Sequence, residues 1–290
     1  MKKIVAMALA LLLAGGALAE TSRPIDLLCL FAEEGNEHQV KALLLQDPTL
    51  VNDRGGNGFT PLHWAAGAGH KRVADILLAQ GAAIDARDDA GATPLHLAAF
   101  KGQAALIGLL LAHGAEPGAQ NLKARTPLHD AAGMGHYRIL EMLLAKGAPI
   151  DQGDMAAMTP LLLAAQYGQT KALALLLKKG ADLKLRNAQE ASALHLSAQY
   201  GHYAASKHLL GAGADPNLHN QLGFTPLHYA AMRGDVDLVR LLVGRGAQAN
   251  LPDKHAQTPL HWAELKGHAA AATLLRQATG AATASSPEMN

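Results

Sequence analysis

The sequence has little that would support a disulfide framework or a redox site. Its 290 residues include a single cysteine, Cys29. One cysteine cannot form an internal disulfide. Cys29 lies in the apolar run 27–31, where a buried thiol packs as a small hydrophobic group. The preceding Asp26-Leu27-Leu28 lacks the small residues of a bacterial lipoprotein signal. We therefore expect a core cysteine, with an exposed redox thiol as the alternative.

Aromatic residues and an excess of one charge are also scarce. Aromatics make up 4% of the chain and hydrophobic residues 49%, so leucine and alanine must do most of the packing, which favours closely stacked helices over a sheet sandwich. The chain has 25 Lys and Arg against 24 Asp and Glu. Without Lys2 and Lys3, which belong to the leader described next, 23 cationic residues face 24 acidic ones. No basic excess remains to neutralise phosphates, and this argues against nucleic acid as a partner.

Only one long hydrophobic run occurs, and it lies at the start of the chain. Lys2 and Lys3 precede an apolar stretch over residues 4–14, and Ala17-Leu18-Ala19 follows as an A-x-A cleavage site. This order is typical of a secretory signal peptide, and the stretch is short for a membrane span. We predict a Sec signal peptide over residues 1–19, with an uncleaved anchor as the alternative, and no span in the mature chain. The protein is expected in the periplasm, or secreted beyond it.

Signatures of catalysis are missing as well. The sequence contains no G-x-S-x-G elbow, no H-E-x-x-H helix and no phosphate-binding P-loop. His129 and Asp130 are neighbours, but adjacent residues on a helix do not face each other. We therefore predict no catalytic residue, no cofactor and no enzymatic activity.

What the sequence does contain is a strict repeat of 33 residues. The tetrapeptide Thr-Pro-Leu-His, or a close variant, begins seven times without insertion or deletion, at Thr60, Thr93, Thr126, Thr159, Ser192, Thr225 and Thr258. One glycine marker keeps step at Gly69, Gly102, Gly135, Gly168, Gly201, Gly234 and Gly267, and a second at Gly81, Gly114, Gly147, Gly180, Gly213 and Gly246. Such self-similarity indicates a stacked solenoid, which exposes a long surface and usually has no enclosed reaction chamber.

Each repeat predicts two helices and a loop. Thr60 is suited to cap a helix, and Pro61 to occupy its first position, where the missing N–H costs nothing. Gly69 is suited to end that helix in the left-handed conformation. An apolar stripe with helical spacing then predicts a second helix that stops at Gly81. An extended loop with a tight turn completes the unit.

The pattern D-x-x-G-x-T-P-L-H-x-A-A-x-x-G-H, followed by L-L-x-x-G-A-x-x-N, resembles the ankyrin repeat, most closely over residues 88–102 and 220–234. The resemblance implies an all-α ankyrin-repeat solenoid over residues 20–280. Full repeats are expected to start near residues 55, 88, 121, 154, 187, 220 and 253, after a divergent N-terminal unit at 27–52. Residues 281–290 lack periodicity, so we predict a disordered tail.

The chain has fifteen histidines, and most belong to the repeat. Six stand in the tetrapeptide, and four follow the first glycine marker, at His70, His136, His202 and His268. The resemblance implies that the tetrapeptide histidine bonds the turn backbone and ties adjacent repeats. Equivalent positions lie roughly 8–10 Å apart, too far to share a zinc ion at about 2.0–2.1 Å, so we predict no metal site. Leu162, which replaces one histidine, and Ser192-Ala193 predict softer fourth and fifth repeats.

A binding surface is sought where the repeats differ, because the fold does not dictate those residues. The resemblance implies binding along the concave side, formed by the loop tips and the exposed ends of the first helices. The positions before the first glycine marker give Phe100, Lys101, Met134, Tyr167, Tyr200, Met232, Arg233 and Lys266, and the tips add Phe59, Lys123, Arg125, Met158, Leu222 and Phe224. Tyr, Met and Arg are enriched at interfaces. For Phe59 and Phe224, packing within the repeat is the alternative.

These observations predict a monomeric, non-enzymatic adaptor in the periplasm that binds a partner protein and stabilises or localises it. One alternative is an inhibitor or immunity-type protein that occludes an enzyme. Another is a secreted effector that binds host proteins. A module for lipid or cell-wall fragments is a further alternative, although an open groove with few aromatics offers such ligands little.

Overall fold

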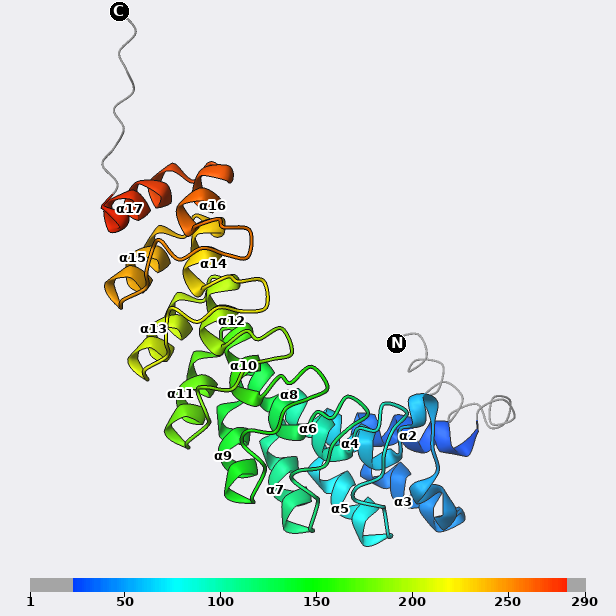
Figure 1. Cartoon of the computed structure of the whole chain (residues 1–290). Coiled ribbons are helices and arrows are strands. Elements are labelled where there is room, and N and C mark those ends of the chain that lie inside the picture. The colour runs from blue at the N-terminus through cyan, green and yellow to red at the C-terminus, as the bar shows by residue number, and fades with distance from the viewer. Residues whose placement is uncertain (1–22, 281–290) are drawn as a thin grey trace, which may run out of the picture. The chain divides into compact units, whose positions relative to one another are not determined.

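The computed structural model describes residues 23–280. Over this range the chain forms sixteen α-helices and two short 3₁₀ helices, without a β-strand. The helices fall into two compact units, which are described separately here: residues 23–122 form the described part of unit 1 and residues 123–280 that of unit 2 (Figure 1). The signal peptide predicted for residues 1–19 and the tail predicted for residues 281–290 lie outside the described residues.

Unit 1 contains three antiparallel helix pairs. The pairs are α2 (Pro24–Glu34) with α3 (Glu37–Gln46), α4 (Pro61–Ala68) with α5 (Lys71–Ala79), and α6 (Pro94–Lys101) with α7 (Ala104–Ala112). The 3₁₀ helices η1 (Pro48–Asn52) and η2 (Gly56–Gly58) lie in the first connection. The first helices α2, α4 and α6 pack in one row, and the second helices α3, α5 and α7 in another.

Unit 2 contains five pairs of the same kind. They are α8 (Pro127–Met134) with α9 (Tyr137–Ala145), α10 (Pro160–Gln166) with α11 (Thr170–Lys178), α12 (Ala193–Gln199) with α13 (Tyr203–Gly211), α14 (Pro226–Arg233) with α15 (Val236–Gly244), and α16 (Pro259–Leu265) with α17 (Ala269–Thr279). First helices again pack on first helices and second helices on second helices. In Figure 1 the loops of this unit project beyond the layer of first helices. This architecture is the predicted ankyrin-repeat arrangement of helix pairs.

The tetrapeptide Thr or Ser and the histidine together begin the first helices α4, α6, α8, α12 and α14. The backbone N–H of Thr60 donates to His63 Nδ1 at 3.2 Å, and the Thr60 hydroxyl lies 2.8 Å from the same nitrogen. Because Nδ1 accepts a backbone hydrogen, the proton of the neutral ring is on Nε2. Ser192 makes the same contact to His195, at 2.8 Å. The prediction that Ser192 weakens its cap is therefore wrong, since a serine hydroxyl supplies the same oxygen.

The Nε2–H of the same histidine also ties its repeat to the next one. In His63 it donates to the carbonyl of Ala92 at 3.1 Å. Within unit 2 the equivalent bonds reach Met158, Phe224 and Gln257, from His129 at 2.9 Å, His195 at 3.0 Å and His228 at 3.1 Å. The predicted structural role of these histidines is confirmed. Leu162 has no ring nitrogen and cannot form such a tie, although Thr159 still caps its helix through the Leu162 N–H at 3.3 Å.

The two glycine markers are required for different reasons. Gly168 and Gly180 both have left-handed backbones, with φ of 66° and 89°, a conformation that other residues adopt at a cost. A Cβ atom at Gly180 would meet nothing within 4 Å, whereas one at Gly168 would lie 2.6 Å from Nδ1 of His202 in the next repeat. Glycine is thus needed at position 168 for both backbone conformation and space, and at position 180 for conformation alone.

Leucine and alanine fill the core, as the composition predicts. Leu62, Ala65 and Ala66 of α4 are fully buried, and the small alanines allow the neighbouring first helices to pack closely. Cys29 is 6% exposed, and burial raises the pKa of its thiol to about 12. The prediction that Cys29 is a core residue is confirmed.

Candidate protein-binding surface

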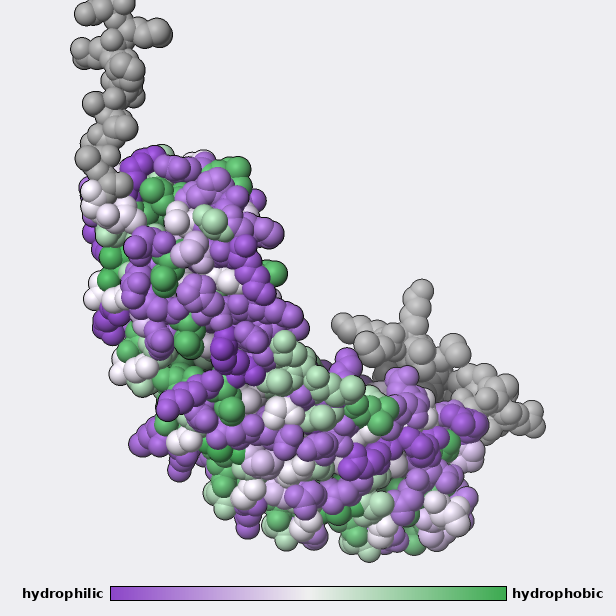
Figure 2. Space-filling model, in the orientation of Figure 1, coloured by the Kyte–Doolittle hydropathy of each residue, from purple (hydrophilic) through white to green (hydrophobic). Residues whose placement is uncertain are grey.

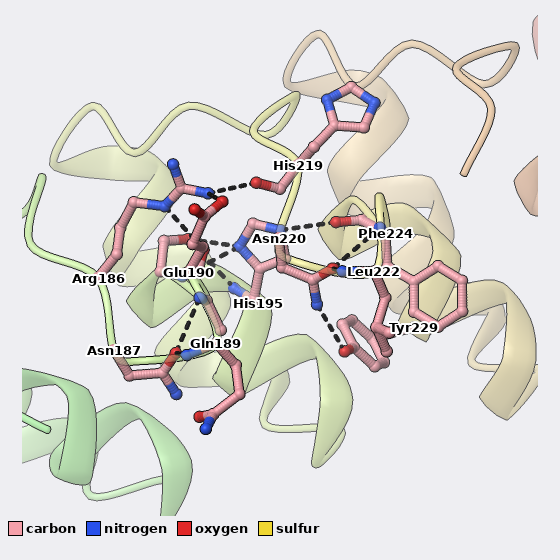
Figure 3. A network of polar contacts seen from close by, with 12 residues as sticks. Arg186, Asn187, Gln189, Glu190, His195, His219, Asn220, Leu222, Phe224 and Tyr229 are labelled. Atoms are coloured by element: carbon pink, nitrogen blue, oxygen red, sulfur yellow. Dashed lines mark hydrogen bonds and ion pairs between the residues drawn. The ribbon is translucent and has the colours of Figure 1, made fainter. Parts of the chain in front are cut away.

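In unit 2, polar side chains hold the loops in shape by forming hydrogen bonds with the loop backbone (Figure 3). The Asn220 side-chain oxygen accepts hydrogen bonds from the N–H groups of Leu222 and Phe224, at 2.9 and 3.0 Å. The Asn220 amide also donates to the Tyr229 hydroxyl at 2.8 Å. Asp or Asn stands at the same place in every full repeat except the first, where Gly55 replaces it. The Asn220 side chain therefore shapes its own loop.

Arginines connect successive loops in the same structural way. Arg186 donates from Nε to the carbonyl of Glu190 at 2.7 Å, and its guanidinium also bonds the carbonyl of His219 in the next loop (Figure 3). In unit 1, Arg54 Nη2 donates to the carbonyl of Arg87 at 2.9 Å. We call these arginine-to-carbonyl bonds the arginine ladder, and the sequence analysis did not predict it. Its signal was available, because Arg54 and Arg87 are one repeat apart.

The buried histidines have no catalytic geometry. Burial lowers the pKa of His129 and His195 to about 4, and it also lowers the pKa of His63 and His228. They are neutral at pH 7, with both ring nitrogens used by the backbone or the cap. No group of three or more His, Cys, Asp or Glu within residues 23–280 is placed to hold a metal ion.

Several residues predicted at the loop tips are not exposed there. Met158 is only 7% exposed, so the prediction that it contacts a partner is wrong; its sulfur accepts a hydrogen bond from Asn187 at 3.6 Å. Phe224 is half-buried and packs on the rings of His228 and Trp262, with centroids 5.5 and 5.6 Å away. The alternative of packing within the repeats describes Phe224.

Two further tip residues also have partners within their own unit. Phe59 is half-buried; its ring stacks on His63 at 5.5 Å and meets Trp64 edge-to-face at 5.2 Å. Arg125 Nε donates to Asp154 Oδ2 at 2.9 Å. The ring of Phe59 thus packs within its own repeat, and Arg125 connects two neighbouring loops of unit 2 through its hydrogen bond to Asp154.

In unit 1 the predicted pair Phe100 and Lys101 ends helix α6. Both side chains are exposed, and Lys101 Nζ lies 5.7 Å from the centroid of the Phe100 ring. This separation permits a cation–π contact. The two residues therefore present a combined cationic and aromatic surface on this unit.

In unit 2 the predicted residues Met134, Tyr167 and Tyr200 end three successive first helices, and they are 45%, 54% and 46% exposed. A Cβ atom at Gly133 would lie 3.6 Å from the Tyr167 ring, so this ring covers the end of the preceding helix. Tyr200 stacks on His202, with centroids 6.3 Å apart. These three side chains form a row, because they stand at equivalent positions of three successive repeats.

The next two repeats carry the predicted residues Met232, Arg233 and Lys266 at the corresponding positions, and the roles of these side chains differ. Arg233 lies against Gly201, and its Nη1 donates weakly to the carbonyl of Gln199 at 3.4 Å. Met232 is half-buried, and its carbonyl accepts from His268 Nε2 at 3.1 Å. Lys266, which follows α16, is exposed. Arg233 therefore helps to hold its repeat, while Lys266 extends into solvent.

The residue after the first glycine marker has a role that sequence reasoning missed. His70, His202 and His268 each donate from Nε2 to a carbonyl at the end of the previous first helix, at 2.9–3.1 Å. Gln103 and Gln169 do the same with their side-chain amides. The sequence did contain a signal for this role, because a His or Gln recurs directly after the first glycine marker.

Two exposed tyrosines at the starts of second helices were also missed. Tyr137 begins α9 and Tyr203 begins α13, and they are 36% and 41% exposed. Both follow the turn that Met134 and Tyr200 precede, so they lie at the same end of the helix pairs. Exposed apolar residues occur at the loop tips too, at Leu122, Met155 and Leu222.

The visible face of each unit is mainly hydrophilic, with hydrophobic residues in small groups (Figure 2). A site on this surface would therefore depend on a few side chains and not on a broad apolar area. Within residues 23–280, every helix is too short or too polar to cross a lipid bilayer.

The geometry of paired helices, capped by Thr and His and closed by left-handed glycines, matches a known family. A family model described as "Ankyrin repeats (3 copies)" matches overlapping segments at residues 28–121, 91–154, 106–187, 150–218 and 194–284. The chain is an ankyrin-repeat protein. Ankyrin repeats generally mediate protein–protein interaction and are typically binding scaffolds without enzymatic activity. No curated protein matches this ankyrin-repeat chain.

Proposed function

We propose that this ankyrin-repeat protein is a non-enzymatic adaptor that binds a partner protein in the periplasm and stabilises or localises it. The row formed by Met134, Tyr167 and Tyr200 carries the proposal. These side chains are 45%, 54% and 46% exposed, on three consecutive repeats. Tyrosine is one of the residue types that dominate the binding energy at protein interfaces.

Export is supported by the charged start, the apolar stretch and the Ala17-Leu18-Ala19 site of residues 1–19. Cell fractionation tests this part of the proposal. The full chain should appear in the periplasmic fraction and begin at Glu20, whereas a chain without residues 2–19 should stay in the cytoplasm. A full-length chain that stays in the cytoplasm with its start intact would contradict export.

Affinity capture tests the binding function. The mature chain, residues 20–290, is immobilised and exposed to the envelope fraction of the source cells. We expect one or a few proteins to be retained by the wild type and lost by the Tyr167→Ala/Tyr200→Ala variant. The matched control is Leu45→Ala, since Leu45 is 84% exposed on unit 1. Recovery of lipid or glycan alone would overturn the proposal.

The consequence for the partner separates an adaptor from an inhibitor. If the captured protein is an enzyme, an adaptor leaves its turnover unchanged at saturation. An inhibitor abolishes turnover, because it covers the active site. Measuring the partner's activity with and without the mature chain therefore decides between these two uses of the same surface.

A further inference from the structure

Unit 2 gathers most of the tyrosines of the chain at one place. Of the five tyrosines, four lie at the turns between first and second helices of three successive repeats. With Met134 they form what we call the tyrosine surface: Met134, Tyr137, Tyr167, Tyr200 and Tyr203.

Contacts between repeats make this surface continuous. The Tyr167 ring covers Gly133 of the preceding repeat. Lys171 Nζ lies 5.9 Å from the centroid of the Tyr137 ring, which joins the same two repeats from the other side of the turn. His202, which stacks on Tyr200, donates to the carbonyl of Gln166 at 3.0 Å. The third repeat is thereby fixed against the end of α10.

The hydroxyl groups of these four tyrosines form no hydrogen bond within the described part of the chain. None of them takes part in a hydrogen bond between residues 23 and 280, whereas the hydroxyl of the fifth, Tyr229, accepts from Asn220 at 2.8 Å. Tyr229 is half-buried and serves the loop. The tyrosine surface thus offers four O–H donors, next to exposed rings, to a ligand outside the protein.

The charges beside the tyrosine surface have mainly one sign. The helices α9, α11 and α13 carry Arg138, Lys171, Lys178 and Lys207 and only one acidic residue, Glu141. Arg138, Lys171 and Lys207 stand within the first five positions of their helices, near the tyrosines, and all three are exposed. None of the three belongs to an ion pair among the described residues.

From this arrangement we infer that the tyrosine surface binds an acidic polypeptide segment that also carries apolar or aromatic side chains. Carboxylates of the segment accept hydrogen bonds from the tyrosine hydroxyls and pair with the three cations. Its apolar side chains lie on the exposed rings and on Met134. The inference rests on the proposed function, because it names the chemistry of the partner that the same surface binds.

A polypeptide is favoured over a nucleic acid by the spacing and number of the cations. Single-stranded nucleic acid also stacks on aromatic rings, but it is held in a groove whose positive charge follows the backbone. Here the cations Arg138 and Lys171 occur once per repeat, and the third repeat has Ala204 at that position with Lys207 instead. Three separated charges suit individual carboxylates better than a continuous line of phosphates.

Selection from a random peptide display library tests the inference with the mature chain. Peptides retained by the wild type are expected to be enriched in Asp and Glu together with Phe, Tyr or Leu. A retained peptide is then measured by fluorescence anisotropy. We expect Lys171→Glu to weaken its binding by about tenfold or more, because charge reversal replaces attraction with repulsion. The matched control is Lys178→Glu, which makes the same change at the far end of α11 and should leave affinity within about twofold.

Each outcome decides the inference. Enrichment in Lys and Arg, no enrichment, or equal losses with the Lys171 and Lys178 variants would overturn it. Tighter binding of an oligothymidine strand or of phosphatidylglycerol vesicles than of any selected peptide would overturn it as well. If envelope capture succeeds while acidic peptides are not selected, the proposed function stands and the inference fails. If neither experiment finds a protein or peptide ligand, both fail.

Discussion

Single residues that depart from the repeat show what each position contributes. Trp262 Nε1 donates to Asp253 Oδ2 at 2.9 Å, nine residues earlier in the chain. The equivalent Trp64 has Gly55 at that distance, and its buried Nε1 has no hydrogen-bond partner among residues 23–280. A Cβ atom at Gly55 would lie 3.1 Å from Cys29 Sγ. The thiol thus occupies the space that a side-chain acceptor would need.

This difference predicts unequal costs for the same substitution. Both Trp64→Phe and Trp262→Phe lose ring area, but only the second also breaks a hydrogen bond and leaves Asp253 without it. We expect Trp262→Phe to lower the free energy of unfolding by about 1–2 kcal/mol more than Trp64→Phe. Urea denaturation followed by circular dichroism measures both. An equal or larger loss for Trp64→Phe would contradict the account.

Asp130 is a second departure, because three other repeats have Leu97, Leu163 and Leu196 at this position. Burial raises the pKa of the half-buried Asp130 carboxyl to about 7, and Arg125 opposes the rise less strongly. The folded state therefore binds a proton between about pH 4 and pH 7 that the unfolded state releases. Ionised Asp130 destabilises the fold most above pH 7, and this cost falls as the pH falls.

Replacement of Asp130 by leucine should accordingly stabilise unit 2 in a pH-dependent way. We expect Asp130→Leu to raise the free energy of unfolding, with a gain about 2 kcal/mol larger at pH 8 than at pH 5. Urea titrations at the two pH values measure the difference. Asp130→Asn is the control that keeps the size of the side chain and removes only the charge. A gain independent of pH would show that the carboxyl is not perturbed.

At the scale of elements, the turn after a first helix and the turn after a second helix require glycine for different reasons. Gly168, at the turn after α10, needs a left-handed backbone and contacts His202 of the next repeat. Gly180, at the turn after α11, needs only the backbone conformation. We expect Gly180→Ala to cost about 1 kcal/mol, since alanine adopts this conformation at that penalty.

Gly168→Ala should cost more than its counterpart. The new methyl group would displace His202 and break its bond to the Gln166 carbonyl, adding about 1 kcal/mol or more. Thermal unfolding of the two variants measures this, and the Gly168 variant should also loosen Tyr200, which stacks on His202. If both variants melt at the same temperature, the contact between repeats is unimportant for stability.

At the scale of the whole molecule, the buried histidines make stability depend on pH. Burial lowers the pKa of His129 and His195 from 6.5 to about 4. As the pH falls below 6.5, the unfolded chain takes up these protons first, so the stabilisation present above pH 6.5 is lost progressively toward pH 4. Each of the two should contribute about 2 kcal/mol of lost stability between pH 7 and pH 5.

Comparison of the wild type with His129→Leu isolates one such contribution. Leucine is compatible with this position, as Leu162 shows. The variant should be less stable at pH 7, because it lacks the tie to Met158, but its stability should change less between pH 7 and pH 5. A variant whose unfolding free energy falls as steeply as that of the wild type would contradict the assignment.

The helix pairs and the role of the tetrapeptide could be predicted because the same pattern of capping, apolar and glycine residues occurs seven times in the sequence. The surface could be predicted only in part. Tyr167 and Tyr200 were found at positions that vary between repeats, whereas Met158 looked variable yet is buried beside Asn187. Tyr137 and Tyr203 were missed because a first-position helical residue carries no periodic signal. The arginine ladder was missed because its acceptors are backbone carbonyls, so that only the spacing of one repeat between Arg54 and Arg87 could have indicated it.

The central claim is that this ankyrin-repeat protein binds a partner through the exposed row on unit 2. Isothermal titration of the captured partner into the mature chain tests it most directly, with the wild type, Tyr167→Ala/Tyr200→Ala and Leu45→Ala measured side by side. The account predicts that the tyrosine variant keeps its helical content and binds at least about tenfold more weakly, while Leu45→Ala binds like the wild type. An unchanged dissociation constant for the folded tyrosine variant would contradict it.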